Sequence, residues 1–117
     1  MEYNIKDMVK LAYQALDEKK AINPQILDIG KISVMADYFI IASGNNANQV
    51  QAMADNVTET LAKAGYHCRQ TEGFRQANWI LLDFGDLVIH IFNHEDRIFY
   101  DLERIWRDGD RIDIAEI

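Results

Sequence analysis

One stretch of sequence decides how this chain folds: Trp79-Ile80-Leu81-Leu82-Asp83-Phe84-Gly85-Asp86-Leu87-Val88-Ile89-His90-Ile91-Phe92. Two apolar runs flank Gly85-Asp86, a dipeptide typical of the tight turn that closes a β-hairpin. A two-residue turn sets the register of the strands, so Phe84 pairs with Leu87 and the pairing continues outward. The sequence therefore predicts a hairpin with strands at 80–84 and 87–92.

Because side chains alternate along a strand, this hairpin has two faces. One is entirely apolar and should pack beneath helices: Ile80, Leu82, Phe84, Leu87, Ile89 and Ile91. The other is mixed: Trp79, Leu81, Asp83, Val88, His90 and Phe92. Asp is disfavoured inside a strand, so Asp83 needs a partner, and His90 and Arg97 are the candidates. Aromatic groups beside a carboxylate and an imidazole resemble a protein interface more than a sealed core.

Two helices are predicted before the hairpin. Asn4 can cap the first, which ends before Pro24. Asn46 or Asn48 can cap the second, and Gly65 is a natural cap for its C-terminus. Their apolar stripes have helical spacing: Ile5, Met8, Val9, Ala12 and Leu16 in the first, then Val50, Met53, Ala54, Val57, Leu61 and Ala64 in the second.

Further strands are expected at 26–29, 38–43 and 66–71. The run 38–43 is continuously apolar, which is typical of a strand buried on both faces at the centre of a sheet. In 66–71 the side chains of Tyr66 and Cys68 should share one side. The sequence thus predicts an α/β (α+β) fold, a single compact domain with a mixed sheet of about five strands and helices packed on it.

Two regions follow the hairpin. Asn93 can cap a last helix with apolar positions at Ile98, Phe99, Leu102, Ile105 and Trp106. The tail 107–117 alternates enough to add a strand or to stay mobile.

Composition narrows the function. The chain has 117 residues, with 12 Lys and Arg against 19 Asp and Glu and a net charge of -7, which suits one domain. Excess acid argues against direct nucleic-acid binding, because such affinity comes mainly from Lys and Arg, and it favours a basic protein partner. Cys68 is the only cysteine, so no intramolecular disulfide can form, and we expect a small buried hydrophobe there.

No targeting segment is expected. The N-terminus lacks a secretory signal and the apolar runs are too short to cross a membrane, so we expect a soluble cytoplasmic protein with no membrane partner.

The sequence offers few residues arranged for catalysis or for binding a metal or phosphate. Gly44 lies at a strand-to-helix turn, where phosphate can bind, but a helix-capping turn is favoured because the other glycines of a phosphate loop are missing. His94-Glu95 begins a zinc-protease motif whose second histidine is replaced by Ile98. Asp83 and Asp86 lie near a turn, where Asp is common. We therefore expect no catalytic site, no metal and no cofactor.

Several motifs together resemble the ribosomal silencing factors, the Iojap-like proteins. The most specific are the W-x-x-x-D-x-G-D-x-x-x-H run from Trp79 to His90 and the F-Y-D-L-E-x-x-W run from Phe99 to Trp106. The others are Asp37-Tyr38-Phe39-Ile40-Ile41-Ala42-Ser43-Gly44, Glu72-Gly73 and Ala77-Asn78-Trp79. The resemblance covers 1–106 of a single domain spanning 1–117 and leaves 107–117 as a variable tail.

The resemblance implies a non-catalytic mechanism. Family members bind the large ribosomal subunit through its ribosomal protein fourteen, block joining of the small subunit, and lower translation when nutrients are scarce. It also implies a nucleotidyltransferase-like outline without the catalytic signature, and a homodimer. A degenerate nucleotide-binding enzyme is the alternative, suggested by that outline and by the Gly44 turn.

Carried onto this chain, the resemblance implies Trp79 as the aromatic anchor. The acidic side that meets a basic ribosomal protein would comprise Glu72, Asp83, Asp86 and Glu103. His90 and Tyr100 would orient or pack that surface. Alternatively, Tyr100, Glu103 and Trp106 simply dock the last helix on the sheet.

Overall fold

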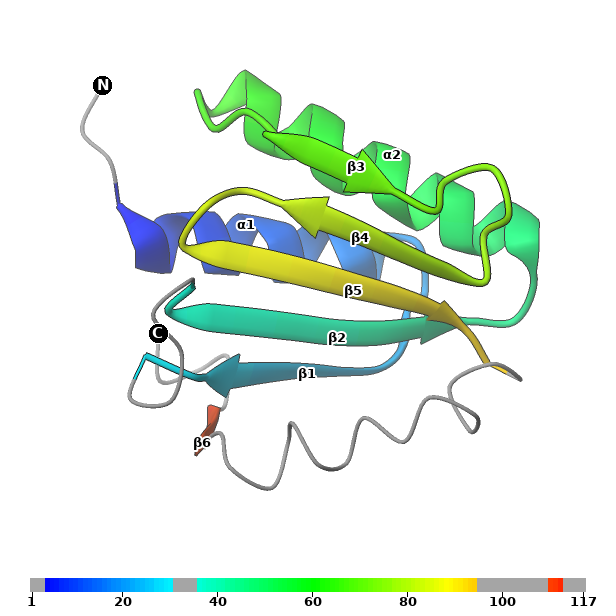
Figure 1. Cartoon of the computed structure of the whole chain (residues 1–117), viewed down its shortest axis with the longest axis horizontal. Coiled ribbons are helices and arrows are strands. Elements are labelled where there is room, and N and C mark those ends of the chain that lie inside the picture. The colour runs from blue at the N-terminus through cyan, green and yellow to red at the C-terminus, as the bar shows by residue number, and fades with distance from the viewer. Residues whose placement is uncertain (1–3, 31–35, 95–109, 113–117) are drawn as a thin grey trace.

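The computed structural model describes residues 4–30 and 36–94 and the backbone of 110–112. These form two helices and six strands along the described chain (Figure 1). In chain order they are α1 (Ile5–Glu18), β1 (Ile22–Asp28), β2 (Tyr38–Gly44), α2 (Ala47–Lys63), β3 (Gln70–Glu72), β4 (Trp79–Asp83), β5 (Leu87–Asn93) and β6 (Asp110–Ile112).

The strands form one mixed sheet in the order β3-β4-β5-β2-β1-β6. The two central strands, β2 and β5, are parallel, and every other neighbouring pair is antiparallel. The central place of β2 confirms the expectation from its unbroken apolar run. The short β6, which pairs with β1, brings the sheet to six strands.

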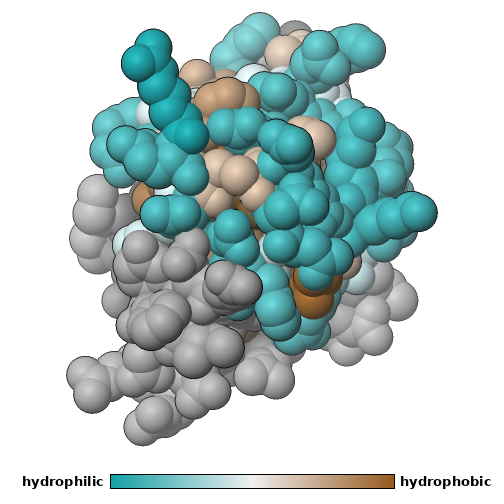
Figure 2. Space-filling view, turned by 90° about the vertical axis from the view of Figure 1, so that its right-hand side faces the viewer, coloured by the Kyte–Doolittle hydropathy of each residue, from teal (hydrophilic) through white to brown (hydrophobic). Residues whose placement is uncertain are grey.

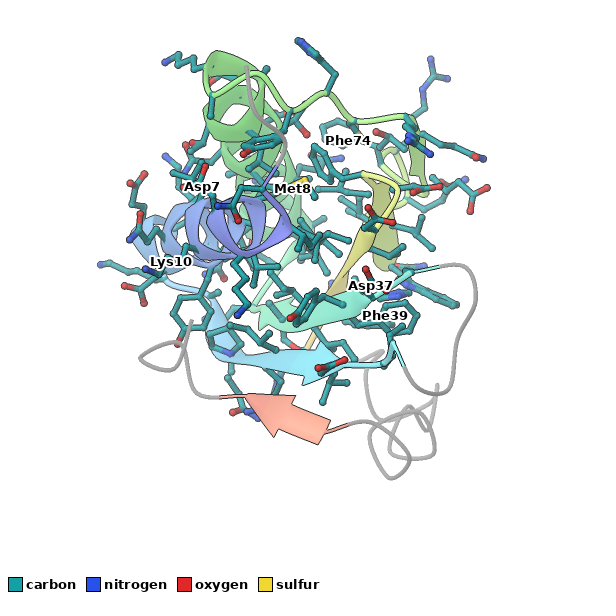
Figure 3. All side chains as sticks on the ribbon, turned by 90° about the vertical axis from the view of Figure 1, so that its left-hand side faces the viewer. Asp7, Met8, Lys10, Asp37, Phe39 and Phe74 are labelled. Carbon is teal, nitrogen blue, oxygen red and sulfur yellow. The ribbon has the colours of Figure 1, made fainter. Side chains whose placement is uncertain are left out.

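The hairpin register is confirmed, since Asp83 pairs with Val88 and Ile80 with Ile91. Its apolar face packs with α1 and α2 in the larger core cluster, so both helices cover the same face of the sheet (Figure 1). Met8 points from α1 toward the sheet, whereas Phe39 lies on the far side of β2 (Figure 3). The face opposite the helices carries a second cluster of buried residues: Leu27, Ile29, Ala36, Ile41 and Phe92.

Both helices begin where a side-chain oxygen accepts a hydrogen bond from the first turn. Asn4 Oδ1 accepts from the backbone N–H of Asp7 at 3.1 Å, and Asn46 Oδ1 accepts from that of Gln49 at 2.9 Å. Asn46, and not Asn48, is therefore the cap of α2. No helix of the described residues is long and apolar enough to cross a membrane.

Every predicted strand differs in its bounds from the structure. Strand β4 covers Trp79–Asp83 instead of 80–84, and β2 and β5 each extend one residue further, to Gly44 and Asn93. Strand β1 begins at Ile22 and contains Pro24, which a register shift between Ile22 and Gln25 accommodates as an irregularity in the pairing. Strand β3 covers only Gln70–Glu72. Asn93 ends β5, and its N–H donates to the carbonyl oxygen of Asn78 at 3.0 Å.

Tyr66 does not lie in a strand, because α2 and α1 hold it instead. Its backbone N–H donates to the carbonyl of Leu61 at 2.8 Å, and its hydroxyl donates to Asp7 Oδ2 at 3.1 Å. Cys68 is half-buried instead of fully buried. The predicted helix at 98–106 lies outside the described residues, whereas part of the tail forms β6.

Candidate protein-binding surface

Four ring side chains meet on the sheet face opposite the helices, which we call the aromatic face: Phe39, Trp79, His90 and Phe92. Trp79 is paired with Phe92 across β4 and β5, and their rings stack with centroids 5.4 Å apart. Phe39, from the parallel neighbour β2, meets His90 edge to face at 4.8 Å. The alternation of three adjacent strands brings these residues together.

Trp79 and His90 are joined by a hydrogen bond. The indole Nε1–H donates to His90 Nδ1 at 3.0 Å. Indole nitrogen can only donate, so Nδ1 must accept, and the neutral imidazole carries its proton on Nε2. Trp79 is half-buried, whereas His90 is only 5% exposed.

Burial lowers the pKa of His90 from 6.5 to about 4. The imidazole is therefore neutral at physiological pH, in agreement with the tautomer that the indole requires. The Nε2 atom is buried and has no hydrogen-bond partner within the described part of the chain.

The mixed face is more enclosed than an interface prediction implies. Phe92 and His90 are buried, and the remaining side chains are half-buried: Trp79, Leu81, Asp83 and Val88. Trp79 is a large aromatic residue of the hairpin that packs partly against the buried cluster and leaves part of its side chain accessible.

Three aspartates gather at one end of the sheet, which we call the hairpin end: Asp37, Asp83 and Asp86. The carbonyl oxygen of Asp86 accepts from the backbone N–H groups of Asp37 at 2.8 Å and Tyr38 at 3.0 Å, which joins the turn to the start of β2. Asp37 and Phe39 lie close together when this end is viewed (Figure 3).

The proposed partnership of Asp83 with His90 is wrong. Asp83 Oδ1 accepts from the N–H of Gly85 at 2.8 Å, so this carboxylate stabilises the turn, while His90 bonds to Trp79. The other candidate partner, Arg97, lies outside the described residues. The guanidinium of Arg69 lies against Gly85 in the turn.

Negative charge at the hairpin end affects its neighbours. Burial, and then the carboxylates of Asp28 and Asp37, raise the pKa of Tyr38 above its usual value.

The predicted site residues do not form one cluster. Trp79 and Asp83 stand at opposite ends of β4, about 13 Å apart at the usual rise per residue. Glu72 is exposed on the short strand β3, where it pairs with Leu81 and its Oε1 accepts from Gln70 Nε2 at 2.7 Å. Tyr100 and Glu103 lie outside the described residues.

Sequence reasoning missed Phe39 and Asp37. Phe39 lay within an apolar run assigned wholly to the core, and only the parallel pairing of β2 with β5 places it beside His90. Asp37 reaches the hairpin end through the backbone bond to Asp86. Alternation within 38–43 was the available signal for Phe39, but it could not identify the neighbouring strand.

The Gly44 turn has a packing explanation. A Cβ at Gly44 would lie 2.9 Å from Val50 Cγ2, so the absence of a side chain lets β2 approach α2. The carbonyl of Gly44 accepts from the N–H of His94 at 2.7 Å.

The end of the molecule that carries the Gly44 turn is mainly hydrophilic, with small apolar areas between polar ones (Figure 2). The described residues contain no group of three or more His, Cys, Asp or Glu placed to hold a metal ion.

Fold and surface together define a small α/β domain whose sheet presents an aromatic, acid-flanked face. A family model described as "Ribosomal silencing factor during starvation" matches residues 2–117. The ribosomal silencing factor RsfS of Bacillus subtilis (strain 168) is 40% identical over 111 residues, which are 95% of this chain and 94% of that protein. The chloroplastic protein Iojap of Zea mays is 29% identical over 102 residues, which are 86% of this chain and 44% of the maize protein.

Solved structures share the fold. A crystal structure of a Chromobacterium violaceum protein has a TM-score of 0.87 at 33% sequence identity and covers 97% of this chain and 93% of its own. One from Bacillus halodurans has a TM-score of 0.82 at 36% identity, covering 92% of this chain and 97% of its own. The chain belongs to the family of ribosomal silencing factors, which confirms the resemblance seen in its motifs.

Proposed function

We propose that this protein binds the large ribosomal subunit through its ribosomal protein fourteen and sterically blocks joining of the small subunit. Translation is thereby repressed in the cytoplasm when nutrients are limited. The observation that carries this function is the family match, which extends over residues 2–117. The protein acts by occupying a surface and not by catalysis.

The aromatic face supports such docking because Trp79 combines a fixed inner part with an accessible outer part. Tryptophan is enriched among the residues that contribute most to protein interfaces, and loss of such a residue typically costs at least about 2 kcal/mol of binding. Trp79 is therefore the anchor of the proposed complex.

The acids around this face select a basic partner. Glu72 and Asp86 are exposed, and the whole chain carries a net charge of -7. Such a surface attracts a basic protein and is repelled by the ribosomal RNA around it, so charge contributes to orientation as well as to affinity. No direct nucleic-acid contact is part of the complex.

Co-sedimentation with isolated large subunits tests the binding. The wild-type protein should pellet with the subunits at micromolar concentration, and Trp79→Ala should not. Tyr13→Ala is the matched control, because Tyr13 is a half-buried aromatic residue on α1, across the sheet from the aromatic face. Failure of the wild type to bind would reject the proposal.

Neutralising single charges tests the electrostatic part. Glu72→Gln and Asp86→Asn should each weaken binding, and added salt should reduce the difference from the wild type. Glu59→Gln removes the same charge from the exposed side of α2 and should have little effect. Equal effects of Glu72→Gln and Glu59→Gln would show that only net charge matters.

The proposal includes a homodimer of the free protein. Sedimentation velocity should give twice the chain mass of 13.5 kDa in the absence of subunits. A monomer at all concentrations up to about 100 μM would remove the dimer from the account, since protomer concentration governs such an equilibrium.

A further inference from the structure

The accessible tryptophan of the aromatic face is held from beneath by a buried side chain. His90 is 5% exposed and lies between Phe39 on one neighbouring strand and Trp79 on the other. Its Nδ1 accepts the indole N–H of Trp79 at 3.0 Å, while Phe92 stacks on the indole ring at 5.4 Å. One hydrogen bond and one stacked ring thus fix both the position and the rotation of the indole.

A histidine is energetically unfavourable at this place in the fold. The surrounding cluster is apolar, and His90 Nε2 is buried with no hydrogen-bond partner among the described residues. A buried donor without a partner destabilises the folded state, and an apolar ring of similar shape would avoid that penalty. The group that does have a partner is Nδ1, and its partner is Trp79.

We propose that His90 is a positioning residue for partner binding: through Nδ1 it holds the Trp79 indole in the orientation that the ribosomal partner receives. This role rests on the proposed function of the aromatic face. An anchor that is already ordered loses less conformational freedom on binding, so the same contacts give higher affinity. His90 itself makes no contact with the partner.

The restraint on Trp79 can be measured without the ribosome. The chain has two tryptophans, so Trp106→Phe leaves Trp79 as the only source of an indole N–H resonance. In this background His90→Phe retains a ring and removes the acceptor, whereas His90→Asn retains an acceptor on the δ atom. We expect the Trp79 indole proton to exchange with water about two- to tenfold faster in His90→Phe, the range that loss of one hydrogen bond gives, and less so in His90→Asn.

Binding to isolated large subunits is then compared for the same variants. His90→Phe should bind about two- to tenfold more weakly, and His90→Asn should recover part of the loss. The free energy of unfolding of His90→Phe at pH 7 should equal or exceed that of the wild type. A residue with a merely structural role would give the opposite result, a loss of stability without a specific change at Trp79.

The outcomes separate this role from the function on which it rests. Unchanged indole exchange in His90→Phe would overturn the positioning role, whether or not the wild type binds subunits. Faster exchange with wild-type affinity would also overturn it, because the restraint would then not serve binding. If the indole proton exchanged faster in His90→Phe but the wild type did not bind large subunits, the hydrogen bond would be confirmed. The proposed function, and with it the role of His90 in partner binding, would be rejected.

Discussion

Acidification should destabilise this protein through one buried imidazole. Burial lowers the pKa of His90 to about 4, whereas an imidazole in the unfolded chain titrates near 6.5. Between these pH values the unfolded state binds a proton that the folded state does not. The free energy of unfolding therefore falls as the pH falls from about 6.5 to about 4, and the contribution of His90 is fully present above that window.

The size of the effect follows from the difference in pKa. One pKa unit corresponds to about 1.4 kcal/mol, so lowering the pH from 7 to 4.5 should remove on the order of 2 to 3 kcal/mol through His90. Other groups also titrate in this range, so the informative quantity is the difference between the wild type and His90→Phe. The variant should lose less stability than the wild type by that amount.

Urea unfolding at a series of pH values from 7 to 4.5 measures both stabilities, with the transition followed by circular dichroism. His67→Gln is the control, because it removes an exposed imidazole and leaves the buried one in place. The loss of stability that His90 causes on acidification should persist in this control. If the wild type and His90→Phe lost the same stability on acidification, the neutral buried imidazole would be the wrong description of this site.

Three further substitutions, two of them with a matched control substitution, test the packing and the turns by urea unfolding at pH 7. Gly44→Ala places a Cβ 2.9 Å from Val50 Cγ2 and should cost about 1 to 3 kcal/mol, whereas in Gly30→Ala the nearest contact is an ordinary 3.4 Å and stability should change little. Asn46→Ala removes the cap of α2 and should cost about 1 kcal/mol, and Asn48→Ala, also exposed, should cost much less. Gly73→Ala should destabilise the protein more than Gly44→Ala, because the new Cβ would overlap the carbonyl oxygen of Trp79 and because Gly73 has a φ of +77°. Equal stability of Gly73→Ala and the wild type would contradict the loop geometry before β4.

The hairpin could be predicted from sequence because its determinants are local. Gly85-Asp86 sets the register, and strict alternation then assigns every side chain of 80–84 and 87–92 to a face. The structure agrees, since Ile80, Leu82 and Ile89 join the core beneath the helices and Trp79 and Phe92 lie on the opposite face. Helix caps were predictable for the same reason, although sequence alone could not choose between Asn46 and Asn48.

What escaped prediction depends on partners distant in sequence. The sequence pattern assigns Tyr66 to a strand, whereas in the structure its hydroxyl donates to Asp7 on α1. The sequence offers Asp83 and His90 as an ion pair on one face of the hairpin, but the carboxylate accepts from the backbone N–H of Gly85 in the turn, and the indole N–H of Trp79 donates to the imidazole. Phe39 joins the aromatic face only because β2 is the parallel neighbour of β5.

Subunit joining, followed by light scattering, tests the central claim most directly. Large subunits incubated with the wild-type protein before small subunits are added should fail to join, with inhibition complete near one protein per large subunit. Trp79→Ala should leave joining at its uninhibited rate, and Tyr13→Ala should inhibit as the wild type does. Undiminished joining at a saturating concentration of wild-type protein would contradict the account.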